Sequence, residues 1–160
     1  MKTRLLPVLL AAAIAAFALS ATAPAREQVV TSGKRRTVVV ATRKLPKLGV
    51  ILVDSKGRTL YMFVPDKRRT VTCVRTCAAV WPPLKLAKGA KPVARGKAKT
   101  SLLGSDRDPA GGRVVTYHRW PLYTYVADTA PGQAKGQALN LNGGLWYVLA
   151  PSGQVIRKKP

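Results

Sequence analysis

Short apolar runs separated by turn residues recur between residues 48 and 156. The stretch GVILVDSKGRTLYMFV contains two such runs around residues 54–57, a turn in which glycine suits a positive φ. The stretch RVVTYHRWPLYTYV bends at residues 117–121, and GGLWYVLAPSGQVI turns at residues 151–153. An earlier run, TVVVATR, is long enough for one further strand. The pattern therefore predicts three hairpins and an early strand.

Long helices are disfavoured by the same pattern. The chain has 12 prolines and 13 glycines, which interrupt helices. Only VRTCAAVW could form a short helical turn, in the region between Cys73 and Trp81. The predicted fold class is all-β, with two related β-repeats packed as one pseudo-twofold sandwich or small barrel.

Two of the strand segments are copies of one another. Residues 60–66 read LYMFVPD, residues 122–128 read LYTYVAD, and a turn-rich stretch and then a tryptophan follow each copy. Such internal similarity predicts a duplicated structural unit. We assign repeat one to residues 48–84 and repeat two to residues 113–156.

Alternation along the copied strand assigns its side chains to two faces. Tyr61 and Phe63 share one face, and both faces are apolar, as in a strand covered on both sides. The aromatic residues are therefore predicted to support the core, while Asp66 and Asp128 accept backbone N–H bonds and fix the turns after each strand. The motif residues, structural here and a candidate site in the alternative interpretation, are Tyr61, Phe63, Asp66, Tyr123, Tyr125 and Asp128.

The remaining segments show no regular spacing of apolar residues. Residues 85–112 are dominated by Lys, Gly, Ala and Pro, and we predict a basic linker there. Residues 26–47 are predicted to be a mobile basic N-terminal segment that contains the early strand. Residues 157–160 form a basic tail.

The first 25 residues have the form of a secretory signal peptide. Two basic residues precede an uncharged apolar run at residues 5–19, and a small-residue stretch allows cleavage after Ala23 or Ala25. This run is shorter than the roughly 20 residues of a spanning helix, and no later run is long enough. No cysteine lies near the cleavage site for lipid attachment. We expect a secreted, extracytoplasmic protein, without a lipid anchor or transmembrane segment.

Charge changes this picture by suggesting a partner. The chain has 28 Lys and Arg against 6 Asp and Glu, and loss of Lys2 and Arg4 with the signal lowers its net charge from +22 to +20. Such a surface attracts polyanions. Nucleic acid is disfavoured for an exported protein, which leaves anionic cell-wall polymer or lipid headgroups, or a solvated basic face without a dedicated ligand. The candidate contact residues are Lys67, Arg68, Arg69, Lys85, Lys88 and Lys91.

The chain has two cysteines, Cys73 and Cys77. Four residues apart on a helical turn, they suit a disulfide, which would stabilise by about 2 kcal/mol on the entropic model. The bridge would fix the turn that carries Trp81, which we interpret together with Trp146 as an aromatic lid. The alternative is a thiol-redox or copper-handling pair, with Met62 as a further soft ligand.

No recognised catalytic constellation emerges from the sequence. Asp66 and Asp128 could act as paired acids only if the two repeats brought them face to face, so a hydrolase is the third hypothesis. The sole histidine, His118, lacks a Gly-x-Ser-x-Gly context and is interpreted as an exposed turn residue. We therefore expect no catalytic residue, metal or cofactor.

Several linked stretches carry a family resemblance. LGVILVDSKGRTLYMFVPD, CVRTCAAVWPPL, GRVVTYHRWPLYTYVADTAPGQAKGQ and GGLWYVLAPSG, in this order over residues 48–153, resemble the bacterial secreted-repeat proteins. These are also described as predicted lipoproteins with a conserved Tyr-x-aromatic-x-x-Asp motif. The resemblance implies an exported protein and no known activity. This chain departs from the family in lacking a lipidation cysteine, and it has Arg75 where the family has a small residue between the cysteines. We expect a non-enzymatic envelope or binding module.

Overall fold

The computed structural model describes residues 37–67 and 69–159. The predicted signal peptide, the first part of the predicted N-terminal segment, Arg68 and Pro160 lie outside the described residues. The strands are β1 (Val38–Leu45), β2 (Gly49–Asp54), β3 (Tyr61–Phe63), β4 (Lys85–Leu86), β5 (Pro92–Ala94), β6 (Leu103–Arg107), β7 (Arg113–Tyr117), β8 (Trp120–Pro121), β9 (Asn140–Leu141), β10 (Gly144–Leu149) and β11 (Val155–Ile156). The helical elements are η1 (Val64–Asp66), α1 (Thr76–Val80) and η2 (Thr100–Leu102).

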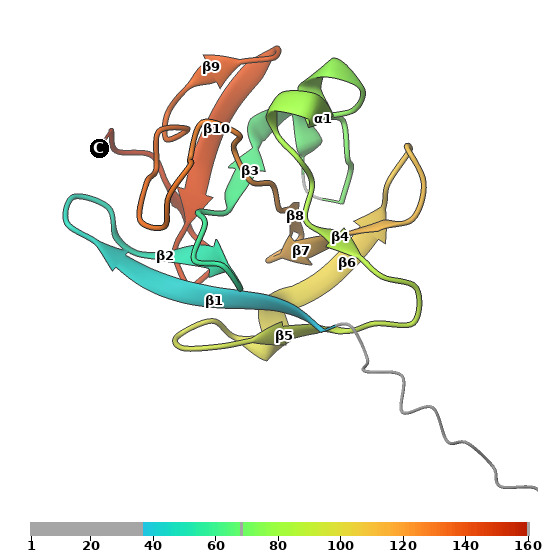
Figure 1. The fold of residues 1–160 in the computed structure, drawn as a ribbon, viewed down its shortest axis with the longest axis horizontal. Coiled ribbons are helices and arrows are strands. Elements are labelled where there is room, and N and C mark those ends of the chain that lie inside the picture. Colours follow the sequence, from blue (N-terminus) through green and yellow to red (C-terminus); the bar gives the residue numbers. More distant parts are fainter. Residues whose placement is uncertain (1–36, 68, 160) are drawn as a thin grey trace, which may run out of the picture. The chain divides into compact units, whose positions relative to one another are not determined.

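The strands of the described part form three sheets (Figure 1). One has the order β2-β1-β5, the second β11-β10-β3 with β9 added to β10, and the third β4-β7-β6 with β8 added to β7. The single α-helix of these residues, α1, is the short turn predicted between Cys73 and Trp81. The all-β prediction is confirmed, and of its two forms the structure has the sandwich rather than one closed sheet.

Two of the three predicted hairpins are present, those turning at residues 117–121 and 151–153. The first is not a regular hairpin: the turn at residues 54–57 is closed by one isolated bridge, Val53↔Thr59, and β2 and β3 then enter different sheets. The early strand is β1, which pairs antiparallel with β2 over six residue pairs from Val40↔Asp54 to Leu45↔Gly49. Between β7 and β8, His118 and Arg119 have φ values of 48° and 69° and form a two-residue turn. Positive φ at both positions is what a type I′ turn requires. The third hairpin joins β10 to β11 through the expected turn.

The segment at residues 85–112 is not a structureless linker, and that prediction was wrong. It contains β4, β5 and β6, of which β5 pairs parallel with β1 and β6 pairs antiparallel with β7 over five residue pairs. These strands are half-buried or exposed along most of their length. Pairing with neighbouring strands supports them, so their sequence carries little apolar period.

Two groups of buried side chains form the core, one on each face of β3. Tyr61 and Phe63 belong to the first, and Leu60 and Met62 belong to the second. The predicted covering of both faces is therefore confirmed. Residues from the two repeats enter both groups, so neither repeat encloses a core of its own.

Candidate functional site

The two copies of the motif meet at a reciprocal backbone contact. The N–H of Tyr61 donates to the carbonyl of Tyr123 over 2.8 Å, and the N–H of Tyr123 donates back to the carbonyl of Tyr61 over 3.0 Å. An antiparallel bridge between matching residues of two copies places a local twofold axis between them. The motif residues are therefore brought together across this axis.

The hydrogen bonds of the motif side chains run from each repeat to the other. The hydroxyl of Tyr61 donates to Oδ2 of Asp128 over 2.6 Å, and the hydroxyl of Tyr123 donates to Oδ2 of Asp66 over 2.6 Å. All four residues are buried. Each tyrosine thus satisfies the carboxylate of the other copy, which ties the two repeats together through two buried charge-assisted bonds.

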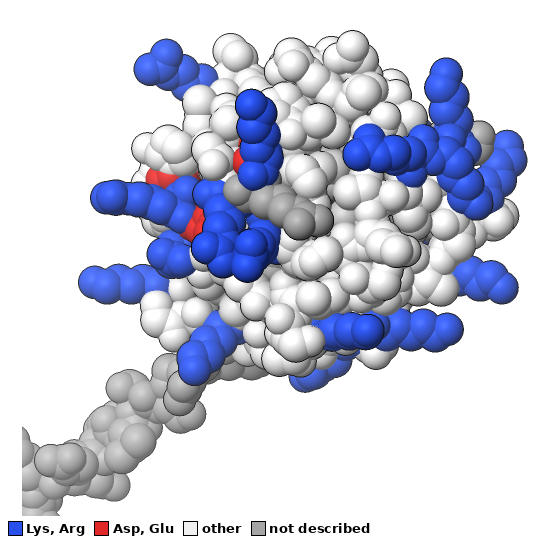
Figure 2. Space-filling view, turned by 180° about the vertical axis from the view of Figure 1, so that it is seen from behind, with Lys and Arg blue, Asp and Glu red and all other residues white. Residues whose placement is uncertain are grey.

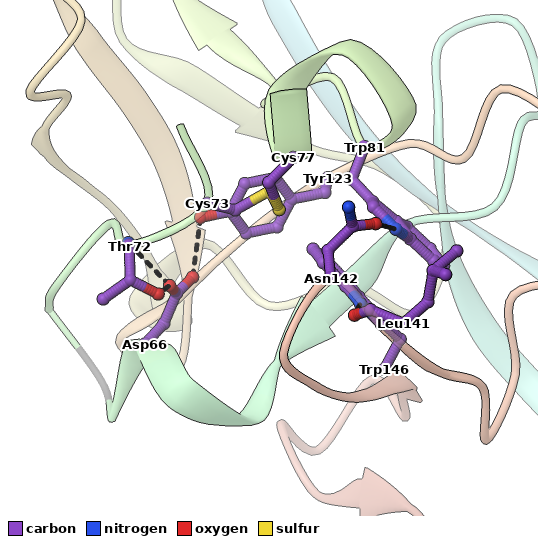
Figure 3. Close-up of a disulfide and its surroundings, with 9 residues drawn as sticks. All are labelled: Asp66, Thr72, Cys73, Cys77, Trp81, Tyr123, Leu141, Asn142 and Trp146. Carbon is purple, nitrogen blue, oxygen red and sulfur yellow. Dashed lines mark hydrogen bonds between the residues drawn. A yellow bond between two sulfur atoms is a disulfide. The ribbon is translucent and has the colours of Figure 1, made fainter. Parts of the chain in front are cut away.

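The second oxygen of each aspartate holds the turn that follows it. Oδ1 of Asp66 accepts the backbone N–H and the hydroxyl of Thr72 over 2.8 and 2.7 Å (Figure 3). Oδ1 of Asp128 accepts the backbone N–H of Lys135 over 2.9 Å. The predicted role in fixing turns is what these contacts provide.

The surroundings of Tyr61 and Tyr123 keep both hydroxyls protonated, so that they can donate hydrogen bonds. Burial raises the pKa of the Tyr61 and Tyr123 hydroxyls well above its usual range, and the neighbouring carboxylates raise it further. Burial also raises the pKa of Asp66, an effect that the hydrogen bonds from Tyr123 and Thr72 oppose. Both carboxylates are enclosed and already bonded, so the contacts of this cluster are those of a scaffold.

A column of four aromatic rings crosses the same axis. The ring centroids of Phe63 and Trp146 lie 4.1 Å apart, those of Trp146 and Trp81 lie 3.8 Å apart, and those of Trp81 and Tyr125 lie 4.1 Å apart. All three pairs are stacked, and both tryptophans are fully buried. The lid interpretation therefore needs correction, because the two indoles lie at the centre of the core and not over it.

The polar edges of the indoles are anchored to one loop. Nε1 of Trp81 donates to Oδ1 of Asn142 over 3.1 Å, and Nε1 of Trp146 donates to the carbonyl of Leu141 over 2.9 Å (Figure 3). The tight packing extends to Gly136, where an added Cβ would lie 2.6 Å from the ring of Trp81. The column leaves no space for a ligand at this point.

The predicted disulfide between Cys73 and Cys77 is present, with a Cα–Cα distance of 5.2 Å. Both cysteines are buried, and the helix α1 that they clip leads directly into Trp81. The two sulfur atoms are bonded to each other, so in this state neither is a thiolate that could bind copper. The bridge holds α1 against the aromatic column.

The predicted polyanion contacts are mostly exposed and unpaired. Lys67, Arg69, Lys88 and Lys91 are exposed and form no ion pair with any described residue. Lys85 is exposed as well, but its ammonium group pairs with the buried carboxylate of Asp108. Arg68 lies outside the described residues.

Charges of opposite sign are segregated in this protein. Among the described aspartates, all but Asp106 are buried, and they accept bonds from turns or from the other repeat. Every described Lys and Arg is exposed, apart from the half-buried Arg58. Figure 2 shows the consequence: Lys and Arg side chains project from several parts of the face, whereas acidic groups are visible at one side only.

Sequence reasoning did not include Arg107, Arg113 or Arg119 among the candidate contacts, and of these only Arg107 lies in the segment assigned to a linker. Arg107 and Arg113 lie directly opposite each other on β6 and β7, and like charges in that position destabilise a strand pair. The signal was their placement on either side of Asp-Pro-Ala-Gly-Gly, a turn sequence that predicts a hairpin. Arg119 was also missed, although it occupies the tip of the predicted second hairpin.

Comparison with known proteins is informative at the family level. The model of the family described as a secreted repeat of unknown function matches the chain twice, at residues 42–85 and 105–150. No curated protein and no solved structure matches. In the described part, no helix has the length and apolar character needed to cross a bilayer. The two matches take in the β1–β2 and β6–β7 hairpins, so each repeat begins earlier than its apolar runs indicated. They cover more than half of the sequence, and the chain belongs to this family of secreted repeats.

Proposed function

We propose that this protein is a secreted, non-enzymatic binding module that associates electrostatically with anionic polymer of the cell envelope. The observation that carries the proposal is the segregation of charge. Buried carboxylates are spent on turns and on contacts between the repeats, whereas nearly all described cations are exposed. The ammonium and guanidinium groups are therefore left to pair with an external polyanion.

The distribution of cations supports a polymer over a lipid surface. The exposed cations include Arg43 and Lys44 on β1, the run from Lys88 to Lys99 around β5, and the C-terminal Arg157–Lys159. In Figure 2 Lys and Arg side chains point in different directions around the face, and a surface without charge lies between them. A flexible chain can follow separated charges, whereas a flat bilayer contacts one side of a protein at a time.

Association of this kind is built from many weak contacts. An exposed ion pair contributes about 1 kcal/mol or less, and the screening length is about 8 Å at physiological ionic strength. Binding is therefore expected to need several cations together and to weaken steeply as salt is added. A specific enclosed pocket would show a much smaller dependence on salt.

Co-sedimentation with purified cell wall across a salt series tests the proposal. The triple substitution Lys88→Gln, Lys91→Gln and Lys97→Gln should lower the sedimented fraction at low salt, since all three side chains are exposed and form no ion pair with a described residue. The matched control replaces the same lysines with arginine, which keeps the charge and should keep the binding.

Two results would overturn the proposal. One is binding that salt and the glutamine substitutions leave unchanged, and the other is no binding to the wall at any salt concentration. A parallel arm uses vesicles that contain anionic lipid. Sedimentation with these vesicles but not with wall would replace the polymer by a lipid surface.

A further inference from the structure

A groove of about 420 Å³ lies beside β6, outside the buried motif cluster. Arg69 from repeat one lines it together with Ser101, Asp106, Thr116 and Arg119 from the second half of the chain. Its volume lies within the range of small-molecule sites, about 300–1,000 Å³. The polar residues of the lining are thus two arginines, one aspartate, one histidine and three residues with hydroxyls, since Ser105 and His118 line the groove as well.

The backbone around the groove is held in an unusual conformation. Arg69, His118 and Arg119 have φ values of 68°, 48° and 69°, in the region that favours glycine. The N–H of Arg69 donates to the carbonyl of Arg119 over 2.8 Å, and Nδ1 of His118 lies 3.1 Å from the carbonyl of Gly153. At His118 and Arg119 these values belong to the type I′ turn between β7 and β8, and that turn places Arg119 beside the groove that Arg69 also lines.

Asp106 differs from the other described aspartates, whose carboxylates are hydrogen-bonded within the protein. Its Oδ2 atom is buried and has no hydrogen-bond partner in the described part of the chain. Desolvating a carboxylate oxygen without a donor is costly, so native structures leave few such atoms. Asp106 also lines the groove, and a rotation of its side chain would bring the unpartnered oxygen to a ligand hydroxyl there.

The corresponding surface of repeat one lacks this chemistry. Leu60 and Leu122 make matching backbone bonds to β2 and β7, and this match places Arg43 of β1 where β6 has Asp106. The surface near Arg43 has the turn at Asp54, whose carboxylate is already bonded within its own turn. Duplication alone does not explain the acid in the groove, because the two copies differ at that position.

We propose that this groove binds a hydroxylated anion, that is, a polyol or sugar unit carrying a phosphate or carboxylate group. The inference rests on the proposed function, because such units are building blocks of anionic polymers. The guanidinium groups of Arg69 and Arg119 bind the anionic group, and a ligand hydroxyl donates to Asp106. A simple anion is repelled by Asp106, and a neutral polyol cannot use the arginines. The combination therefore favours a ligand that has both groups.

Titration of the whole protein with four probes tests this inference: glycerol 3-phosphate, glucuronate, inorganic phosphate and glycerol. Backbone amide chemical shifts report binding residue by residue. Glycerol 3-phosphate or glucuronate should shift the amides of residues 101–106 and 116–119 saturably, whereas glycerol should shift none. A preference between the two hydroxylated probes distinguishes a phosphate from a carboxylate ligand.

The direction in which Asp106→Asn changes the affinity for each probe distinguishes the proposed site from a groove that merely attracts anions. If a ligand hydroxyl donates to the carboxylate, the substitution weakens the hydroxylated probe about tenfold and strengthens inorganic phosphate, because a repelling charge is lost. If the groove merely attracts anions, both probes bind more tightly to Asp106→Asn.

Arg119→Asn should weaken the binding of both probes about tenfold, and asparagine tolerates the positive φ of this position. The matched control, Arg43→Gln, removes a cation near the equivalent turn of repeat one and should leave the affinity of the hydroxylated probe unchanged.

Tighter binding of every anion by Asp106→Asn, or no saturable shift with any probe, would overturn the inference. Neither result contradicts the proposed association with anionic envelope polymer if the native protein still sediments with cell wall. Conversely, saturable binding of glycerol 3-phosphate without any sedimentation would support the groove and refute the association with wall polymer.

Discussion

The exchanged hydrogen bonds predict unequal costs for two matching substitutions. Tyr123→Phe removes the donor to Oδ2 of Asp66, whose other oxygen keeps its bonds to the following turn. Tyr61→Phe removes the donor to Oδ2 of Asp128 and, in addition, the acceptor of the Gly136 N–H at 3.2 Å. The local twofold axis relates the two tyrosines, but the second substitution leaves one more buried polar group without a partner.

The magnitudes follow from burial and charge. A hydrogen bond to a charged group contributes about 1.5–3 kcal/mol, and an unsatisfied buried group costs about 1–3 kcal/mol. Tyr61 and Tyr123 are both fully buried, so water cannot replace the lost hydroxyl without rearrangement of the core. We therefore expect Tyr123→Phe to lower the free energy of unfolding by about 2 kcal/mol and Tyr61→Phe by about 3 kcal/mol.

Urea unfolding of the oxidised protein, followed by tryptophan fluorescence, measures both values. Tyr125→Phe is the matched control, because Tyr125 is half-buried in the same column and its hydroxyl makes no hydrogen bond with a described residue. It should change the free energy of unfolding by less than about 0.5 kcal/mol. A smaller loss for Tyr61→Phe than for Tyr123→Phe, or losses for both that match the control, would refute the reasoning.

Three further predictions concern the supports of the same core. The double substitution Cys73→Ser and Cys77→Ser should lower the free energy of unfolding by about 2 kcal/mol in urea while wall sedimentation persists; loss of sedimentation from a folded variant would contradict a purely structural bridge. Burial raises the pKa of Asp66, so its ionisation opposes folding as pH rises from the unfolded value of about 3.9. The native protein should therefore gain stability relative to Asp66→Asn between pH 7 and about pH 4, and a relative loss on acidification would reverse the inferred sign. Gly136→Ala should cost about 1–3 kcal/mol in thermal or urea unfolding, because the new Cβ would lie 2.6 Å from Trp81, and an unchanged stability would show that the column can yield.

The strands of the apolar segments and the duplication could be predicted, because both are written in local patterns. Tyr61 and Tyr123 were placed correctly in the core from alternation alone. Their partners could not be assigned, because a bond from Tyr61 to its own copy's Asp66 fits the sequence as well as the observed bond to Asp128. Only the packing of one copy against the other decides between these pairings.

The strands β5 and β6 escaped prediction for a different reason. β5 reads Pro-Val-Ala and β6 reads Leu-Gly-Ser-Asp-Arg, and neither has an apolar alternation of its own. Each is ordered by a partner distant in sequence or across a turn, β1 in one case and β7 in the other. Because the groove residue Asp106 belongs to β6, the same error hid the groove.

Positions at which the two repeats agree differ in their surroundings from the position at which Asp106 stands in one repeat and Arg43 in the other. Residues that match in both copies, such as Asp66 and Asp128, are buried and have protein partners for both oxygens. At the position where Asp106 replaces Arg43, the side chains lie at the surface or line a groove, and the carboxylate has no partner in the described chain. Selection for folding acts on both copies alike, since each completes the core of the other. A ligand that needs one site would act on one copy, and an unsatisfied acid that only the second copy contributes, to a groove also lined by two arginines, is the asymmetry that such selection would leave.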